Sequence, residues 1–181
     1  MKILSWLGLS ICAASLFGCA DLCQLRDPKT GESVPSSFTG TVRNLEQRKA
    51  LVTTPVLTKV QTTSCADFDR VVFTFSGNST PGYRTEYIDK PITECASGKV
   101  VPVAGDAWLQ IGLSRSAAHT EAGQATIRER NLSLNYPNLK QLVETCDFEG
   151  EVIWVLGVGS PNPYRVVELT SPPRIVVDVK H

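Results

Sequence analysis

Short runs of alternating apolar and polar residues dominate the chain from about residue 55 to its end. In the run 70–75, for example, Val71, Phe73 and Phe75 fall on one face. Side chains of a β-strand point alternately to opposite faces of a sheet, so this period of two predicts a strand with one buried face. The same criterion predicts strands at 56–62, 70–75, 83–88, 99–103, 107–113, 139–144, 151–158, 164–169 and 174–179. Turn residues separate these runs and no long helical period occurs, which predicts an all-β sandwich or barrel of about eight or nine short strands.

The connections between the runs predict two further features. The strands at 70–75 and 83–88 are joined by the short turn 76–82, which predicts a β-hairpin. Residues 114–138 form a long polar stretch, in which 116–119 is compatible with one helical turn. Loops of this length are uncommon unless they bind something or are disordered.

Two segments of the chain resemble each other. The triplet 67–69 (Asp-Phe-Asp) follows Cys65 and the triplet 147–149 (Asp-Phe-Glu) follows Cys146; each is succeeded by a strand and a Tyr-Arg pair at nearly the same spacing. Two interpretations stay open: chance similarity between two β segments, or two related halves of the sandwich. In related halves, Cys65 and Cys146 occupy equivalent strand entrances and could meet across the two sheets.

The first residues differ from everything that follows. Residues 1–18 begin with Met and Lys and continue as an apolar run that suits a signal-peptide core and is short for a membrane-spanning helix. The run ends in Leu-Phe-Gly-Cys and resembles the bacterial lipobox, in which the cysteine receives acyl chains and becomes the new N-terminus. We therefore expect lipidation at Cys19, which would anchor the protein permanently to a bilayer. The alternatives are an ordinary signal peptide cut elsewhere and an uncleaved anchor.

The balance of charged residues limits the classes of partner that the domain is expected to bind. Once Lys2 is removed with the signal, 17 basic residues stand against 18 acidic ones. Nucleic acids and anionic lipid surfaces are bound through clustered Lys and Arg, so we expect neither as a partner of the domain itself. The bilayer is expected as a partner only through the acylated Cys19.

The residues after the signal segment divide into two parts by their pattern of apolar and polar residues. Residues 19–54 are mixed and polar without a sustained apolar period, and we interpret them as the lipidated cysteine and a polar tether. Residues 55–181 are then the β domain. If Cys23 pairs with a cysteine of that domain, the tether is instead held against it.

Four cysteines survive besides Cys19, and they are Cys23, Cys65, Cys95 and Cys146. An even number in an exported chain predicts disulfides, and four cysteines allow three connectivities. The chain has no Cys-x-x-Cys pair and two histidines, so we expect no zinc or redox site and no cofactor.

Several ordered blocks beyond residue 55 together resemble the AMIN-like domain of bacterial envelope proteins. These blocks are 67–73 (DFDRVVF), 81–84 (PGYR) with Tyr87, 101–107 (VPVAGDA), 147–150 (DFEG) and 172–179 (PPRIVVDV). The family is similar to the AMIN domain, a β-sandwich that localises periplasmic amidases and pilus secretins by binding the cell wall. The resemblance thus implies a non-catalytic envelope module and, at one further remove, peptidoglycan binding. The chain departs from the best-known AMIN proteins because its domain is isolated and expected to be lipidated.

Few side chains in the sequence are suited to act in catalysis. Only His119 and the terminal His181 are available as a general base, and His119 lies in the polar loop. Asp67 and Asp69 alternate at a strand entrance beside Arg70, where capping or a salt link is the commoner use. We expect no catalytic residues; a hydrolase is the third alternative.

A glycan-binding surface would combine aromatic faces with Arg or amide donors. The ligand-binding candidates are Tyr83, Arg84, Tyr87, Trp108, Tyr164 and Arg165, with Gln110 and Trp154 as weaker ones. Each of these side chains has the alternative of packing in the core, above all Trp154. Arg84 and Arg165 each follow a tyrosine, and either an anionic partner or an internal acid such as Glu86 or Asp89 would explain them.

The sequence therefore predicts a membrane-tethered, extracytoplasmic envelope module that binds peptidoglycan or another wall component without chemistry. In a cell with two membranes it would face the periplasm. The alternative is an assembly lipoprotein whose open strand edge, or whose loop 114–138, receives an envelope protein.

Overall fold

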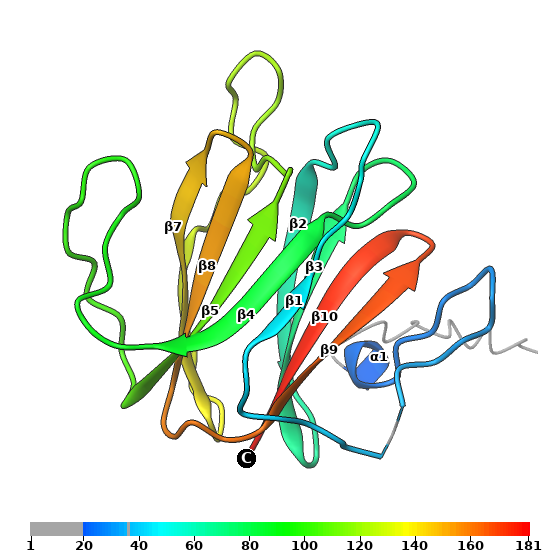
Figure 1. Ribbon diagram of the computed structural model, residues 1–181. Coiled ribbons are helices and arrows are strands. Elements are labelled where there is room, and N and C mark those ends of the chain that lie inside the picture. The colour runs from blue at the N-terminus through cyan, green and yellow to red at the C-terminus, as the bar shows by residue number, and fades with distance from the viewer. Residues whose placement is uncertain (1–19, 36) are drawn as a thin grey trace, which may run out of the picture.

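Eight of the nine alternating runs form strands and, with two short additional strands, make up ten strands in the described residues, arranged in two antiparallel sheets that pack face to face (Figure 1). The computed structural model describes residues 20–35 and 37–181. The six-stranded sheet has the order β1 (Leu45–Gln47), β4 (Gly82–Ile88), β5 (Ala107–Ser114), β8 (Glu151–Val158), β7 (Leu139–Phe148) and β6 (Asn131–Ser133). The four-stranded sheet has the order β2 (Leu57–Ser64), β3 (Phe68–Phe75), β10 (Pro173–Lys180) and β9 (Tyr164–Thr170). The predicted all-β sandwich is confirmed, with one short helix, α1 (Ala20–Cys23), added at the start.

The core lies between the two sheets, where the period-two pattern places it. On β5, the fully buried Leu109, Ile111 and Leu113 face the other sheet. Trp154 of β8 is also fully buried, and its ring lies 6.0 Å from that of Phe73 on β3. Each fully buried side chain of this size contributes about 1.5–3 kcal/mol relative to exposure, so the shared core holds the sheets together. Trp154 is thus a core residue.

The predicted hairpin of 70–75 and 83–88 is wrong. β3 pairs with β2 and β10, whereas β4 pairs with β1 and β5, so consecutive strands lie in different sheets. The segment 76–81 between them crosses from one layer to the other. Alternation determines which side chains face the core, but it is the same for a strand of either sheet, and so it could not identify the partner strand.

Two other local expectations also fail, and two short strands were not expected. Residues 99–103 form no strand, and only Val100 makes an isolated bridge, to Thr93. The strands β1 and β6 have three residues each, too few to show a period. Residues 116–119 form no helical turn, because Ala117 and His119 make isolated bridges to Val56 and Ala125 instead. Short segments of this kind are defined by their tertiary partners and not by their own pattern.

The segment expected to be a free tether packs on the domain. Residues 22–35 and 37–39, which we call the strap, cross the outer face of the four-stranded sheet. Leu25 and Val34 of the strap are buried together with Val72, Leu169 and Val176 of that face. After the strap the chain continues into β1, which is part of the six-stranded sheet. The physical reason is that this outer face is apolar and would otherwise be exposed to water.

A disulfide and buried charges hold the strap. Cys23 is bonded to Cys65, at the entrance of the β2–β3 turn. Beneath the strap, Asp178 accepts hydrogen bonds from Arg70 at 2.6 and 2.8 Å and from Arg165 at 2.8 Å. One further nitrogen of each guanidinium group reaches a carbonyl oxygen of the strap: Arg70 Nη1 donates to Leu22 and Arg165 Nη1 to Ser37, both at 2.7 Å.

Asp27 of the strap is hydrogen-bonded to the end of β9. Its Oδ2 accepts hydrogen bonds from the backbone N–H groups of Thr170 (2.6 Å) and Ser171 (2.9 Å) and from the Thr170 hydroxyl (2.7 Å). Hydrogen bonding from the Thr170 hydroxyl and from nearby backbone amides keeps the pKa of Asp27 far below its usual value. The strap is therefore fastened at its start, middle and end.

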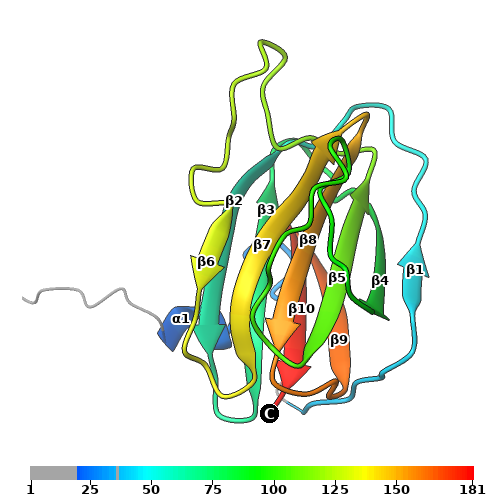
Figure 2. The ribbon, with the colours of Figure 1, turned by 90° about the vertical axis from the view of Figure 1, so that its left-hand side faces the viewer.

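A second segment covers part of the outer face of the six-stranded sheet. Residues 89–106, the cover loop, lie across β5, β7 and β8 (Figure 2). Ile92 and Val103 of the loop are buried against Val143 and Val155. The second disulfide, Cys95–Cys146, joins the loop to β7, so all four predicted cysteines are paired.

The two disulfides bear on the predicted internal repeat. Cys65 and Cys146 do not meet, since each is bonded to a cysteine from a covering segment. The strands that follow the two triplets, β3 and β8, have different neighbours in different sheets. The strand order β2-β3-β10-β9 of one sheet nonetheless repeats as β7-β8-β5-β4 in the other, so β2–β5 and β7–β10 pair in the same way, as two related halves would.

Candidate functional site

The outer face of the six-stranded sheet is open where the cover loop ends. A hollow of about 280 Å³ lies there across β1, β4, β5 and β8. The residues that line it are Glu46, Gln47, Arg48, Tyr83, Arg84, Gln110, Gly112, Ser114, Glu151 and Ile153. The strands that carry these residues are paired with one another, so the spacing of the lining residues is set by the sheet.

Gly112 forms the floor of this hollow because it has no side chain. A Cβ atom built on Gly112 would meet only the carbonyl oxygen of Arg84, at 3.8 Å, which is an ordinary contact. The backbone here is regular strand, paired with Arg84 on one side and Ile153 on the other. A larger residue at position 112 would therefore fill the hollow without disturbing the sheet.

Charges of both signs surround the floor. The side chain of Arg84 is 60% exposed, and its Nη2 donates to Glu86 Oε2 at 2.8 Å. Arg48 and Glu46 form a second ion pair on the rim. Exposed pairs of this type contribute little to stability, so their donors can exchange an internal partner for a ligand at little cost. The internal acid foreseen for Arg84, Glu86, is thus its partner in the structure.

Three of the six candidate ligand residues contribute to this outer face or its rim. Arg84 projects outward from β4, and Trp108 lies on the same side of β5 beside Gln110. One face of the Trp108 ring is occupied by Lys90, whose Nζ lies 4.3 Å from the ring centre, and the ring nitrogen donates to Val103 at 3.1 Å. Tyr83 faces inward but reaches the lining of the hollow at its edge.

The side chains of the other three candidate ligand residues make structural contacts within the molecule. Tyr164 is fully buried, and its hydroxyl group contacts Thr85 and Arg43. Tyr87 packs edge-on against Tyr164, at 5.8 Å between ring centres, and donates to Asn162. Burial raises the pKa of both tyrosines. Arg165 is the buried partner of Asp178 described above, so the internal-acid alternative holds for it as well.

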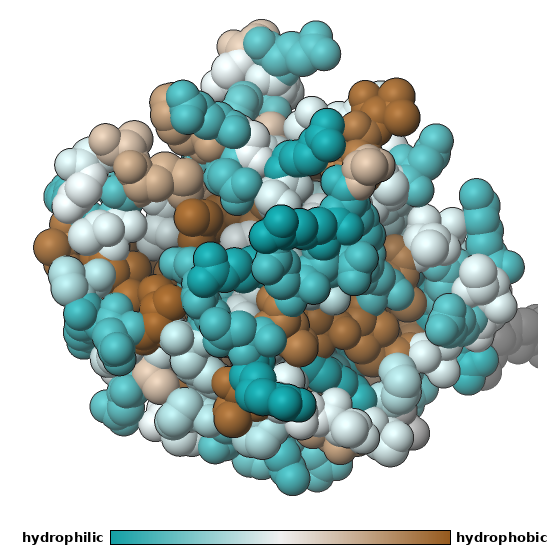
Figure 3. All heavy atoms as spheres, viewed as in Figure 1, coloured by the Kyte–Doolittle hydropathy of each residue, from teal (hydrophilic) through white to brown (hydrophobic). Residues whose placement is uncertain are grey.

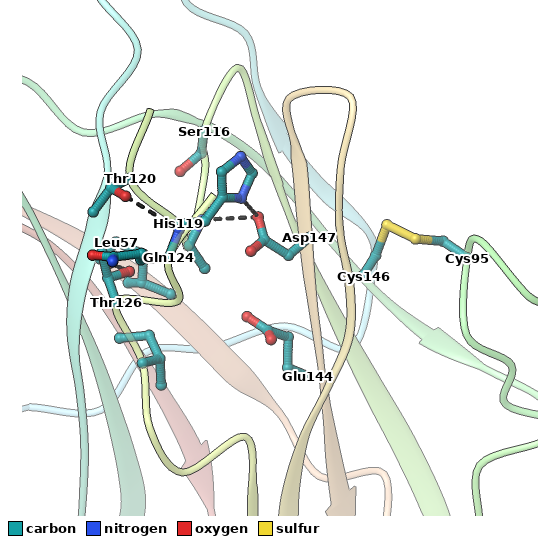
Figure 4. A network of polar contacts seen from close by, with 12 residues as sticks. Leu57, Cys95, Ser116, His119, Thr120, Gln124, Thr126, Glu144, Cys146 and Asp147 are labelled. Atoms are coloured by element: carbon teal, nitrogen blue, oxygen red, sulfur yellow. Dashed lines mark hydrogen bonds and ion pairs between the residues drawn. A yellow bond between two sulfur atoms is a disulfide. The ribbon is translucent and has the colours of Figure 1, made fainter. Parts of the chain in front are cut away.

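A second polar cluster surrounds His119 at the other edge of the same sheet (Figure 4). Asp147 accepts a hydrogen bond from the backbone of Ala118 at 2.9 Å and contacts His119 Nδ1 at 2.8 Å. Arg130 binds Glu144 at 2.6 Å and approaches Asp147 at 3.5 Å. These contacts attach the loop 114–130 to β7, which gives the polar loop an ordered course.

Glu144 has an unusual environment within this cluster. Its side chain is only 3% exposed, and burial raises its pKa to about 7, although Arg130 acts in the opposite direction. Perturbed carboxyls of this kind occur at functional sites and in structural ion-pair networks alike. Sequence reasoning missed Glu144 because an acid on an alternating strand normally marks the solvent side.

The candidate acid Asp69 and Ser116, a serine near the candidate base His119, have structural partners. The hydroxyl of Ser116, near His119 in Figure 4, is buried and donates to the Pro55 carbonyl at 3.0 Å. Asp69 is buried and accepts the backbone N–H groups of Asn138 and Leu139, whereas Asp67 is exposed. The two aspartates therefore do not form a pair directed at one substrate.

Among residues 20–35 and 37–181, no cluster of three or more His, Cys, Asp or Glu side chains is arranged to hold a metal ion. None of the helices in that part of the chain has the length and apolar character needed to cross a membrane. The expected lipidation site, Cys19, and the signal segment 1–18 lie outside the described residues.

Comparison with known proteins identifies one family. The family model of the AMIN-like domain matches residues 55–181. No curated protein and no solved structure matches the chain.

Proposed function

The chain belongs to the AMIN-like family, and from this premise we propose that it binds peptidoglycan through the hollow at Gly112 while a lipid on Cys19 holds it at a membrane. Membership in the family confirms the resemblance and indicates a cell-wall-associated, non-catalytic module of the envelope. The disulfides Cys23–Cys65 and Cys95–Cys146 are consistent with an oxidising compartment. The peptidoglycan ligand and the lipid anchor are the finer steps of the proposal.

The open hollow is the observation that supports wall binding most. Peptidoglycan presents sugar hydroxyls, amides and peptide carboxylates along an extended strand. Arg84 and Arg48 offer charged donors to carboxylates, Gln110 offers an amide, and Glu46 and Glu151 accept from hydroxyl or amino groups. Because the floor is a rigid strand and not a loop, these groups keep their spacing without a ligand.

The strap suggests how the domain would sit relative to a bilayer. Cys19 precedes the disulfide-bonded Cys23 by four residues, a reach of at most ~14 Å for an extended chain. A lipid on Cys19 would thus hold the strap side of the sandwich near the membrane. The hollow lies on the outer face of the other sheet, and so it would point away from the bilayer, toward the wall.

Sedimentation with purified sacculi tests the wall-binding step. Residues 20–181 should co-sediment, and Gly112→Phe should reduce the bound fraction at least fivefold because its ring occupies the hollow. Thr58→Phe is the matched control, since it adds the same ring at an exposed strand position of the other sheet. Equal sedimentation of Gly112→Phe and Thr58→Phe would exclude the hollow, and no sedimentation of the parent protein at low salt would exclude wall binding.

Fractionation of cells tests the anchor separately. The full chain should appear in the membrane fraction and Cys19→Ser in the soluble or precursor fraction. The mass of the mature N-terminal peptide should show acyl chains on Cys19. A mature protein with an unmodified N-terminus would refute lipidation and leave the wall-binding step to be decided by sedimentation.

A further inference from the structure

The chain changes from one sheet to the other just before β1 and leaves a groove behind. Thr41 exchanges two backbone hydrogen bonds of 2.8 Å with Tyr164 of β9, whereas Leu45 already pairs with Thr85 of β4. The groove between the two edge strands, β1 and β9, has a volume of about 500 Å³. It is lined by Thr39, Gly40, Thr41, Arg43, Asn44 and Leu45 from one side and by 164–166 from the other.

Backbone groups of β9 face this groove without a strand to pair with. Tyr164 uses both its N–H and its C=O toward Thr41, and the N–H of Thr170 is bound on the same side by Asp27. Because consecutive residues of a strand point their backbone groups to opposite sides and β9 has a regular register with β10, Val166 and Glu168 must face the same way as Tyr164 and Thr170. In the described chain no strand lies beyond β9, so these are groups that an added strand could use.

The side chains around these groups are apolar, with a cation nearby. Leu45 and Val166 pack against the core and remain partly exposed. Figure 3 shows an apolar patch over this part of the molecule, between β1 and the β9–β10 pair, bordered by polar side chains. Arg43 is exposed at the groove, and in the described part of the chain it has no ion pair.

The far end of the groove is closed. Glu168 of β9 binds the ammonium group of Lys49, which follows β1, and the hydroxyl of Thr80. The free length therefore runs from the Thr41 bridge to this ion pair, or about four residues of β9. That is sufficient for a short added strand but not for a helix, whose diameter of ~10 Å is larger than the spacing of neighbouring strands, ~4.8 Å.

We propose that this groove receives an extended segment of an envelope protein, which adds a strand to β9 beyond Tyr164. Alternate side chains of the segment would contact Leu45 and Val166, and an acidic residue or terminal carboxylate would pair with Arg43. Backbone pairing supplies affinity in this mode, and the alternate side chains supply selectivity. The groove lies at the edge of the sandwich and not on the outer face, so the chain could hold the wall and a protein at the same time.

The test uses the ¹⁵N-labelled full chain in detergent and a synthetic peptide of alternating threonine and valine with a C-terminal glutamate. Binding should shift the amide signals of Val166, Glu168 and Leu45 and leave Gly112 unchanged. Methylating the amide nitrogens along one edge of the peptide should weaken binding at least tenfold, whereas methylating the other edge should change it less than threefold. Equal effects of the two methylated peptides, or shifts centred on Gly112, would overturn the proposal.

Variants of the protein distinguish the contribution of backbone pairing to peptide affinity from that of the Arg43 charge. Val166→Pro removes one edge-facing N–H and should weaken the peptide at least tenfold, while Val166→Thr keeps that N–H and should weaken it less than threefold. Arg43→Ala should weaken the glutamate peptide three- to tenfold and leave an amidated glutamine version unchanged. Soluble wall fragments are the competing occupant: if they shift Val166 and the peptide does not, the groove is a wall site and the protein-partner proposal is wrong.

Discussion

The two sheets of the sandwich are covered on their outer faces in different ways. The four-stranded sheet lies under the strap, which is attached by the ion cluster Arg70–Asp178–Arg165 and by Asp27. The six-stranded sheet lies under the cover loop, which is attached by an apolar cluster that includes Ile92 and Val103. Each covering segment carries one disulfide.

The two covering segments differ in the contacts that each must make with its sheet. Arg70 and Asp178 are almost completely buried, at 1% and 0% exposure of their side chains, so their charges require a complete set of partners. The strap contributes one carbonyl group to Arg70 and another to the neighbouring Arg165. The side chains of the apolar cluster under the cover loop carry no charge and need no hydrogen-bond partners. The cover loop can therefore end partway across its sheet, and the remainder of the face is open as the hollow at Gly112.

The largest expected effect is the loss of the acid beneath the strap. Asp178→Asn leaves two buried guanidinium groups without their counter-charge, and breaking a buried ion pair in this way costs about 3–5 kcal/mol. Urea unfolding of the variant should show this loss in the free energy of unfolding. Asp106→Asn, which changes an exposed acid at the end of the cover loop, should cost less than about 0.5 kcal/mol. Similar costs for the two variants would mean that the strap does not depend on its charges.

The disulfides provide the next comparison. They join residues 42 and 51 apart in the sequence, so the loop-entropy model assigns each a similar contribution of about 4 kcal/mol. Their local effects should differ, because Cys23 lies at the start of the strap whereas the cover loop is also continuous with strands at both ends. Cys23→Ser with Cys65→Ser should therefore open the strap to trypsin after the exposed Lys29.

Cys95→Ser with Cys146→Ser is the matched pair for that experiment. It should lower the free energy of unfolding by a similar amount but leave cleavage after Lys29 unchanged. Mass spectrometry of early tryptic fragments distinguishes the two outcomes. A strap that stays resistant without its disulfide would show that the ion cluster and Asp27 are sufficient to hold it.

A smaller effect concerns Glu144, a buried acid with fewer partners than Asp178. It has one guanidinium partner, Arg130, and the like charge of Asp147 nearby, and its pKa is raised to about 7. A group whose pKa is higher in the folded than in the unfolded state contributes stability below its unfolded pKa, near 4.5, and this contribution is lost as the pH rises through 7. The free energy of unfolding should fall by about 1–3 kcal/mol between pH 5 and pH 8.

Glu144→Gln tests the origin of that slope. Glutamine does not titrate, so the fall between pH 5 and pH 8 should disappear in urea unfolding measured at each pH. Glu94→Gln, an acid on the exposed side of the cover loop, should retain it. An unchanged slope in Glu144→Gln would assign the pH dependence to another group.

The smallest effect is expected at the edge of the cover loop. Lys90→Ala removes the ammonium group that lies over the Trp108 ring, an interaction of about 0.5–1 kcal/mol at a partly exposed site. Lys99→Ala, an exposed lysine of the same loop, is the control and should have no measurable effect. Equal unfolding free energies for the two variants would show that the contact between Lys90 and Trp108 does not help to hold the loop.

Much of the sandwich could be predicted from local pattern, and the candidate site only in part. Alternation located eight of the ten strands of the structure within a few residues. Of the candidate ligand residues, Arg84 lines the open hollow and Trp108 packs against the cover loop beside it, but Tyr164 and Arg165 have the same Tyr-Arg pattern as Tyr83 and Arg84 and are buried. The strap was missed because Leu25 and Val34 are isolated apolar residues in a polar segment, and only Cys23 signalled that it might be attached.

By itself, the sequence determined the fold class, the family and the face of most strands, because these depend on the order of apolar and polar side chains along a few neighbouring residues. Only the tertiary structure decided that β3 and β4 lie in different sheets, that the cysteines pair with covering segments, and that Gly112 lies in the open while Arg165 is buried. Those outcomes depend on contacts between residues far apart in the chain. A strand carries the same local pattern whichever partner it pairs with and whether or not another segment covers it.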